Sequence, residues 1–202
     1  MKKHLQIIAG ILFMMVAGSS FAQTNANDVV KSIVKSFREP KNVELSFSYY
    51  FITDESEQTD EQQGMAYLQG EAYKIILNEQ QTISDGKTIW SYLVDDQEVM
   101  ISNATDGADN TPLKLLTTLD HDYTATFTDS NTITLANPDG QYKLVTLTLE
   151  KKNTLKSMEI HADDGSKMVI NLIGTKFNQD LKDNFFIFNK KAYPKVDIID
   201  MR

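Results

Sequence analysis

Apolar and polar side chains alternate over residues 43–51 of this chain. The apolar positions are Val43, Leu45, Phe47, Tyr49 and Phe51. A period of two places every second side chain on the same side of an extended chain. The pattern therefore predicts a long β-strand with one apolar face.

The segment just before this strand has a helical period instead. Apolar residues at positions 29, 30, 33, 34 and 37 fall on one side of a helix over residues 27–38. Asn27 or Asp28 can cap the start of this helix, and Pro40 ends it. We expect an amphipathic helix whose apolar side covers an apolar surface.

Most of the remaining chain consists of short strand-like runs separated by turn residues. The runs lie at residues 64–68, 73–78, 82–84, 88–94, 98–102, 123–128, 132–136, 142–149, 156–161, 167–177 and 185–188. Their spacing favours an antiparallel meander over parallel βαβ units. Asp85-Gly86 suits a two-residue hairpin, because glycine accepts a positive φ. A short second helix is expected at residues 111–119, where Pro112 suits the first turn.

The number of strands has a consequence for the shape of the sheet. A sheet of about eleven strands is strongly twisted, and such sheets curl or close. A curled sheet has a concave apolar face, and two helices provide little material to fill it. The sequence thus predicts a hydrophobic pocket, while an ordinary core packed by its own aromatic side chains remains the alternative.

The N-terminus has the features of a secretory signal peptide. Lys2 and Lys3 precede an apolar run over residues 5–17, and Ser20 and Ala22 are small residues at the positions that matter for cleavage. The apolar run is shorter than the ~20 residues of a membrane span, the alternative interpretation. We expect residues 1–22 to be removed, with cleavage after Ala22, and residues 23–202 to form one exported domain. The chain has no cysteine for a lipid anchor or a disulfide, so this domain is expected to be soluble after processing. We also expect it to be a monomer.

The composition argues against several classes of function. The chain has 28 acidic and 20 basic residues and a formal net charge of −8, which disfavours nucleic acid and anionic lipid headgroups as partners. It has no His-x-x-x-His pair, no Gly-x-Ser-x-Gly elbow and no glycine-rich phosphate loop. The oxygen-rich loop at residues 106–110 lacks the spacing of a calcium loop. We therefore expect neither an enzyme nor a metal or cofactor site.

Short motifs resemble those of one family of exported proteins. The run Ser84-Asp85-Gly86-Lys87-Thr88-Ile89-Trp90-Ser91-Tyr92 resembles the "SDGKTLW-Y" signature of the LolA family. The run Asn110-Thr111-Pro112-Leu113-Lys114-Leu115-Leu116 is similar to the family's "N-T-P-x-x-L-I" helix. Phe186-Ile187-Phe188 and Val196-Asp197-Ile198-Ile199-Asp200 are similar to its "F-x-F…V-x-V-x-D" end. Leu45-Ser46-Phe47-Ser48 resembles its "F-A-x-F" strand.

The resemblance implies a mainly β fold with some α, in which a curled antiparallel sheet forms an incomplete β-barrel and lid helices cover an apolar cavity. It also implies a periplasmic carrier that takes triacylated lipoproteins from an inner-membrane ABC transporter to an outer-membrane acceptor of the LolB kind. A C16 acyl chain costs roughly 12 kcal/mol to expose to water, at ~0.8 kcal/mol per methylene. Such chains therefore need a carrier. The alternative is a periplasmic binder, sensor or carrier of another lipid or hydrophobic ligand on the same fold.

The resemblance implies that one face of the strands and the second helix line the acyl-chain cavity. The candidates are Leu45, Phe47, Tyr49, Tyr67, Tyr73, Ile75, Trp90, Tyr92, Ile101, Leu113 and Leu116. The lid helix would contribute Val30, Ile33, Val34 and Phe37. For each of these residues, a plain core role is the alternative.

The chain departs from the family pattern at two places. Many members carry an arginine after the second strand that latches the lid to the sheet, and Gly70 stands at that position here. The run at residues 190–194 replaces the usual Pro-Pro-x-Gly. We therefore expect either a different latch or a more open cavity in this chain.

Overall fold

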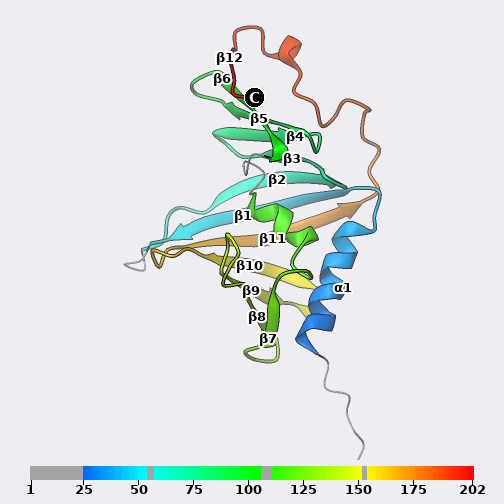
Figure 1. Cartoon of the computed structure of the whole chain (residues 1–202), viewed down its shortest axis with the longest axis vertical. Coiled ribbons are helices and arrows are strands. Elements are labelled where there is room, and N and C mark those ends of the chain that lie inside the picture. Colours follow the sequence, from blue (N-terminus) through cyan, green and yellow to red (C-terminus); the bar gives the residue numbers. More distant parts are fainter. Residues whose placement is uncertain (1–24, 54–56, 106–110, 152–153) are drawn as a thin grey trace, which may run out of the picture.

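The computed structural model describes residues 25–53, 57–105, 111–151 and 154–202. The expected signal peptide and the oxygen-rich loop at residues 106–110 lie outside the described residues. The described chain folds into one twelve-stranded sheet with a helix and a short 3₁₀ helix on the same side of it (Figure 1).

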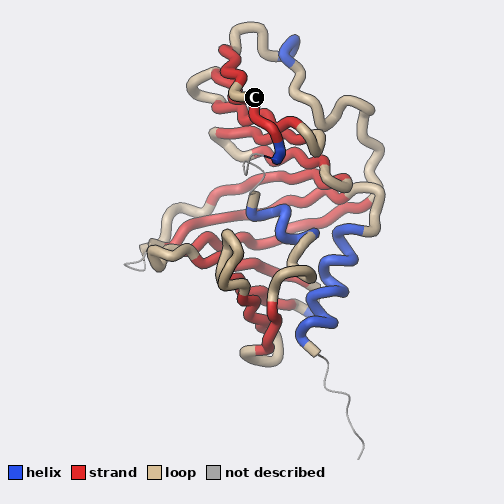
Figure 2. The backbone as a smooth tube through the Cα atoms, in the orientation of Figure 1, coloured by secondary structure: helices blue, strands red, loops and turns tan. Residues whose placement is uncertain are grey.

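The sheet contains every strand of the described chain, in the order β12-β6-β5-β4-β3-β2-β1-β11-β10-β9-β8-β7. The first six strands are β1 (Val43–Ile52), β2 (Gln62–Gln69), β3 (Ala72–Ile76), β4 (Gln80–Ser84), β5 (Thr88–Leu93) and β6 (Glu98–Asn103). The others are β7 (Thr124–Phe127), β8 (Thr132–Ala136), β9 (Leu144–Leu149), β10 (Leu155–His161), β11 (Lys167–Phe177) and β12 (Asp197–Asp200). The edge strands β12 and β7 do not pair with each other, so the expected incomplete, curled barrel is confirmed (Figure 2).

Helix α1 (Ala26–Arg38) precedes β1, as its apolar period predicts. The side chain of Asn25, rather than that of Asn27 or Asp28, caps its start by accepting a hydrogen bond from the backbone N–H of Asn27. The predicted second helix is the 3₁₀ helix η2 (Pro112–Thr117), with Pro112 in its first turn. A further 3₁₀ turn, η4 (Lys190–Ala192), lies close to the C-terminus.

Two expectations about strands are wrong. Residues 185–188 form turns instead of a strand, with the Phe185 N–H bonded to the carbonyl of Lys182 at 3.0 Å. The missed strand is β12, which pairs in parallel with β6, so the sheet is not wholly antiparallel. The reason is that the apolar side chains of the 185–188 segment pack on a face of the sheet, whereas β12 extends its edge.

The β4–β5 hairpin is tight, but its centre lies one residue later than the Asp-Gly pair suggests. The Asp85 N–H bonds to the Thr88 carbonyl at 3.3 Å, which leaves Gly86 and Lys87 as the two central residues. Gly86 has φ +86°, a left-handed conformation that glycine adopts without steric cost. The Asp85 carboxylate accepts the N–H groups of Lys87 and Thr88 at 2.9 and 2.8 Å, which stabilises the turn.

Strand register divides the sheet into two faces. Residues paired across neighbouring strands point to the same side. Leu45 pairs with Ala66, and Ala66 pairs with Ile75. These side chains belong to the same buried cluster as α1, so their side of the sheet is called the inner face and the opposite side the outer face. We call α1 and η2 together the lid.

Candidate functional site

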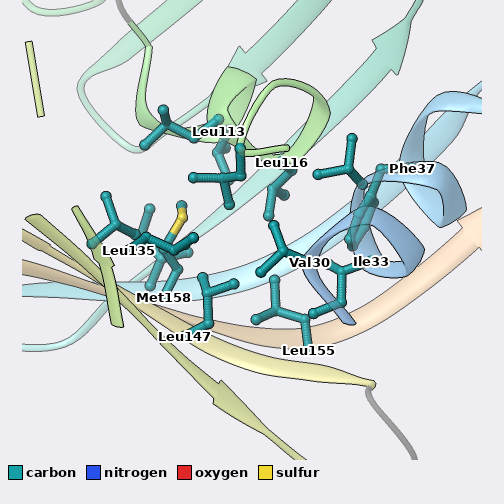
Figure 3. Close-up of a cluster of buried hydrophobic side chains, with 14 of the residues drawn as sticks. Val30, Ile33, Phe37, Leu113, Leu116, Leu135, Leu147, Leu155 and Met158 are labelled. Atoms are coloured by element: carbon teal, nitrogen blue, oxygen red, sulfur yellow. The ribbon is translucent and has the colours of Figure 1, made fainter. Parts of the chain in front are cut away.

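The lid and the inner face form one continuous apolar cluster (Figure 3). The α1 residues Val30, Ile33, Val34 and Phe37 are between 0 and 7% exposed. In Figure 3, Val30 and Ile33 lie on the side of α1 that faces the strands, and Leu113 and Leu116 of η2 lie above them. Val34 belongs to the same buried cluster. The apolar side of α1 therefore covers the sheet, and in this closed arrangement the side chains of the lid fill the concave face.

Seven of the eleven candidate cavity residues are brought together in this cluster. They are Leu45, Phe47, Tyr49, Tyr73, Ile75, Leu113 and Leu116. Tyr49 lies toward the end of β1, where its hydroxyl donates to Gln62 Oε1 at 2.7 Å. Burial raises the pKa of Tyr49, and Glu79 acts in the same direction.

The other four candidates lie on the outer face. Tyr67 pairs with Glu44 in the register that places Leu45 and Ala66 inside. Trp90 pairs with Ile101, and Tyr92 pairs with Val99. The inner face continues from Tyr73 to Ser84 and from Ser84 to Ile89 by strand pairing. Because Ile89 is on the inner face, the adjacent Trp90 is on the outer face. The family motif identified the hairpin but not which of its faces is turned inward.

The outer-face aromatics are covered by the C-terminal segment. Phe185 packs edge-on against Tyr67 with ring centroids 4.8 Å apart, and the Lys74 ammonium lies 5.2 Å from the Phe185 ring. Burial lowers the pKa of Lys74. Farther along, Tyr193 lies 4.8 Å from the Tyr92 ring. Trp90 and Ile101 pack against this second apolar cluster, which is separate from the lid.

Sequence reasoning missed the residues that the strands on the other side of β1 contribute to the inner face. They are Ile133, Leu135, Val145, Leu147, Leu155, Met158, Ile160 and Ile170. Leu135, Leu147, Leu155 and Met158 lie beneath α1 and η2 in Figure 3. The alternation of apolar residues within each of these strands could have indicated them. They were missed because the candidate residues were chosen from the family motifs, which lie elsewhere in the chain.

Polar contacts hold the lid at its margins. Arg38 at the end of α1 donates from Nη2 to the Thr117 carbonyl at 2.5 Å and to Asp120 Oδ1 at 2.7 Å. Asn27 at the other end of α1 accepts the N–H of Ala125 in β7 at 3.2 Å. These bonds lie at the rim of the interface, and buried apolar side chains make up its centre.

Gly70, which the resemblance places at the position of a latch arginine, lies in a tight turn. Gly70 occupies the β2–β3 turn with φ +57°, a left-handed conformation that favours glycine. It borders a small pocket of about 190 Å³ together with Phe37, Arg38 and Thr117. The neighbouring Glu71 instead forms an ion pair with Lys114 of η2 at 3.3 Å.

The short connection between α1 and β1 is anchored to the end of β11. Asn42 is buried, and its side chain exchanges two hydrogen bonds with the backbone of Gln179, at 2.9 and 2.8 Å. Its carbonyl accepts the N–H of Asn178 at 2.9 Å. This end of α1 is thereby fixed to the sheet.

Two pockets of similar size open beside the lid, and their chemistry differs. One, of about 400 Å³, lies between α1 and the strands β10 and β11 and is lined mainly by apolar side chains. The other, of about 380 Å³, lies between η2 and the β8–β9 turn and includes Lys114, Asp122 and Asn137. The inner face beneath the lid is filled by side chains, and these two pockets lie at the edges of the lid.

Within the described residues, no group of three or more histidine, aspartate and glutamate side chains is arranged to hold a metal ion. No helix in the described part of the chain is long and apolar enough to cross a membrane.

The family model described as outer membrane lipoprotein carrier protein LolA matches residues 77–189, which is more than half of the chain. The chain belongs to the LolA family. The matched region begins at the end of β3 and includes the β4–β5 hairpin, η2 and the aromatic part of the C-terminal segment. Comparison with curated proteins finds no match.

Solved structures resemble this fold at low sequence identity. An uncharacterized conserved protein from Thermus thermophilus has a TM-score of 0.53 at 12% identity, covering 87% of this chain and 98% of its own. A LolA superfamily protein from Nitrosomonas europaea has a TM-score of 0.46 at 12% identity, covering 82% and 98%. A putative outer membrane lipoprotein-sorting protein domain from Vibrio parahaemolyticus has a TM-score of 0.43 at 12% identity, covering 84% and 98%. At this identity the first likeness concerns the fold alone.

Proposed function

We propose that this protein binds the acyl chains of lipoproteins between its lid and its inner face and carries them from the inner to the outer membrane. The observation that carries the proposal is the continuous apolar cluster of α1, η2 and the open sheet. Membership of the LolA family, whose model is described as a lipoprotein carrier, supports the identity of the cargo.

The energies of the two states make loading and release compatible. Burying an aliphatic or phenylalanine side chain stabilises by about 1.5–3 kcal/mol. The five large buried side chains of α1, Val29, Val30, Ile33, Val34 and Phe37, thus contribute on the order of 10 kcal/mol. Removing one C16 chain from water stabilises by roughly 12 kcal/mol. A single acyl chain that displaces α1 therefore exchanges one apolar contact for another of similar size.

The proposal includes the cellular setting. The segment at residues 1–22 would direct export and be removed after Ala22, leaving a monomer in the periplasm. Cargo would come from an inner-membrane lipoprotein-releasing ABC transporter and pass to an outer-membrane acceptor. The reaction is physical transfer, with no bond made or broken and no cofactor required.

A second candidate is a carrier of another lipid on the same fold. Gly70 at the position of the latch arginine favours it, because the lid of this chain is held by other contacts. A different way of holding the lid would suit a ligand of different size.

Native mass spectrometry tests both candidates. The full chain is produced in a bacterium with two membranes and purified from the periplasm without detergent. Co-purifying triacylated lipoproteins would support the carrier proposal, and a bound lipid without protein would support the second candidate. A folded protein that carries neither, and that extracts no lipoprotein from inner-membrane vesicles, would contradict both.

A further inference from the structure

We propose that the apolar pocket between α1 and β11, here called the side groove, binds one uncharged alkyl chain while the lid remains closed. The inference rests on the proposed function and extends it, since it places a chain beside the lid rather than beneath it. Ile33 and Phe37 of α1, Leu155 of β10, and Leu172 and Phe177 of β11 form its apolar wall.

The side groove belongs to the inner face. Register pairs Phe47 with Leu172 and Val43 with Phe177 across β1 and β11. The two members of the second pair are covered very differently, because Val43 is 1% exposed and Phe177 is 44% exposed. The apolar inner face therefore extends past the edge of α1, and Phe177 marks the part that the lid leaves uncovered.

The side groove is continuous with the closed cluster. Ile33, Phe37 and Leu155 belong to the buried cluster, and Leu172 packs against it. Three of these residues therefore line the side groove and also belong to the core that the proposed ligand would enter. An alkyl chain lying there would therefore contact side chains of the lid and of the sheet at the same time.

The lining selects for an uncharged occupant. None of the lining residues is charged, although 24% of the chain is. Its polar side chains all carry hydroxyls, as in Ser32, Ser36 and Thr175. The Ser36 hydroxyl already donates to the Ile33 carbonyl at 2.6 Å. A charged headgroup would find no counter-charge here, in contrast to the polar pocket that contains Lys114 and Asp122.

The size of the side groove fits one chain. Its volume is about 400 Å³, near the lower end of the ~300–1,000 Å³ range of ligand pockets. A water molecule occupies about 30 Å³ in the liquid and a methylene group is of similar size, so the space corresponds to on the order of a dozen methylenes. The side groove matches one alkyl chain and is too small for three.

The test compares two exposed apolar residues of the same strand. Phe177 lines the side groove, whereas Ile173, 61% exposed, lies outside it at the irregularity in β1–β11 pairing. Phe177→Glu places a charge in the side groove, and Ile173→Glu is the matched control. The probe is 1-monopalmitoylglycerol, titrated against the whole protein, and a version with a photoreactive diazirine on the alkyl chain maps the contact by mass spectrometry.

We expect the photoproduct on α1 and on β11 near Phe177. We also expect Phe177→Glu to weaken probe binding at least about tenfold while Ile173→Glu stays within about twofold of wild type. Labelling elsewhere, or equal effects of the two variants, overturns the side groove. A wild-type protein that binds a triacylated lipopeptide but not the single-chain probe also overturns it and leaves the carrier proposal standing. Failure to bind either ligand overturns both proposals. Melting temperatures establish that the variants fold, and the wild-type photolabelling stands if one of them does not.

Discussion

Arg38 and Asp120 join the two parts of the lid. The Arg38 guanidinium donates to Asp120 Oδ1 at 2.7 Å and to the carbonyl of Thr117 at 2.5 Å. These bonds link the last residue of α1 to the segment that follows η2, 82 positions away in the sequence. A partly exposed pair with charge-assisted hydrogen bonds is worth about 1 kcal/mol. That is enough to favour the closed lid and small enough for a ligand to overcome.

We expect Arg38→Ala to loosen the lid without unfolding the sheet. Amide hydrogen exchange should become faster in α1 and η2, by about fivefold for a loss of about 1 kcal/mol, and remain unchanged in β1. Arg202→Ala is the matched control, because Arg202 forms a comparable ion pair with Asp200 at 2.7 Å far from the lid. Unchanged exchange in α1 of the Arg38 variant would show that the pair does not hold the lid.

The fluorescence of Trp90 should respond to changes on the outer face but not to ligand binding at the inner face. The Trp90 side chain packs in the cluster with Tyr92 and Tyr193, under the C-terminal segment. We expect Tyr193→Ala to shift the tryptophan emission to longer wavelength, because the indole becomes more exposed to water. Addition of a triacylated lipopeptide should leave the wild-type emission unchanged. A ligand-induced shift would instead place the acyl chains near Trp90.

Gly64→Ala should strain the inner face. A Cβ at Gly64 would lie 2.5 Å from Cζ of Phe47, a buried ring that has little room to move. We expect the free energy of unfolding in urea to fall by about 1–3 kcal/mol, the usual cost of overpacking. Phe47→Leu should partly relieve this strain, so the double variant should be more stable than the sum of the single effects predicts. Strict additivity would argue against the contact.

His161 should make stability depend on pH. Burial lowers the pKa of His161 and Lys167 adds to this, while Glu159, 2.9 Å away, opposes it. Thr146 Oγ1 also faces the ring at 3.2 Å. The unfolded chain, with a histidine pKa near ~6.5, therefore binds more protons than the folded one in the interval below that value.

The free energy of unfolding should consequently fall as the pH decreases through about 6.5 and level off below the folded pKa. Urea titrations between neutral and mildly acidic pH would measure this slope. We expect His161→Gln to flatten it, whereas His121→Gln, at a side chain that is 65% exposed, serves as the control. A slope that is equal in wild type and His161→Gln would contradict the prediction.

The sequence predicted the parts of the fold that depend on local chemistry. The apolar positions of α1 and the alternation in β1 act within a few residues, and the structure has them where expected. The β4–β5 hairpin is also present, with its turn one residue later than the Asp-Gly pair suggested. The run at residues 185–188 has the composition of a strand, but its placement depends on partners distant in the sequence. Phe185 contacts Tyr67 instead of joining a ladder, which no local pattern indicates.

The candidate site was predicted in part for the same reason. A period of two tells which side chains share a face within one strand, but it does not tell which face of that strand meets the next helix. Leu45 and Phe47 were assigned to the lid-covered side through the family motif, whereas Trp90 lies one residue out of phase with Ile89, which continues that side. The contributions of Leu147 and Met158 required the order of the strands beyond β11.

The hydrogen bonds of Asn42 fix the chain next to the C-terminal end of α1. The connection that follows this end of the helix is bonded through Asn42 to Gln179, just beyond β11, and the N-terminal end of the helix is bonded to β7 through Asn27. A helix of 13 residues is about 20 Å long. A rotation of α1 about its C-terminal end would therefore displace Val29 and Val30 farther than Phe37. The space between α1 and the sheet would then open most near the N-terminus of α1, while the contacts near its C-terminus would persist.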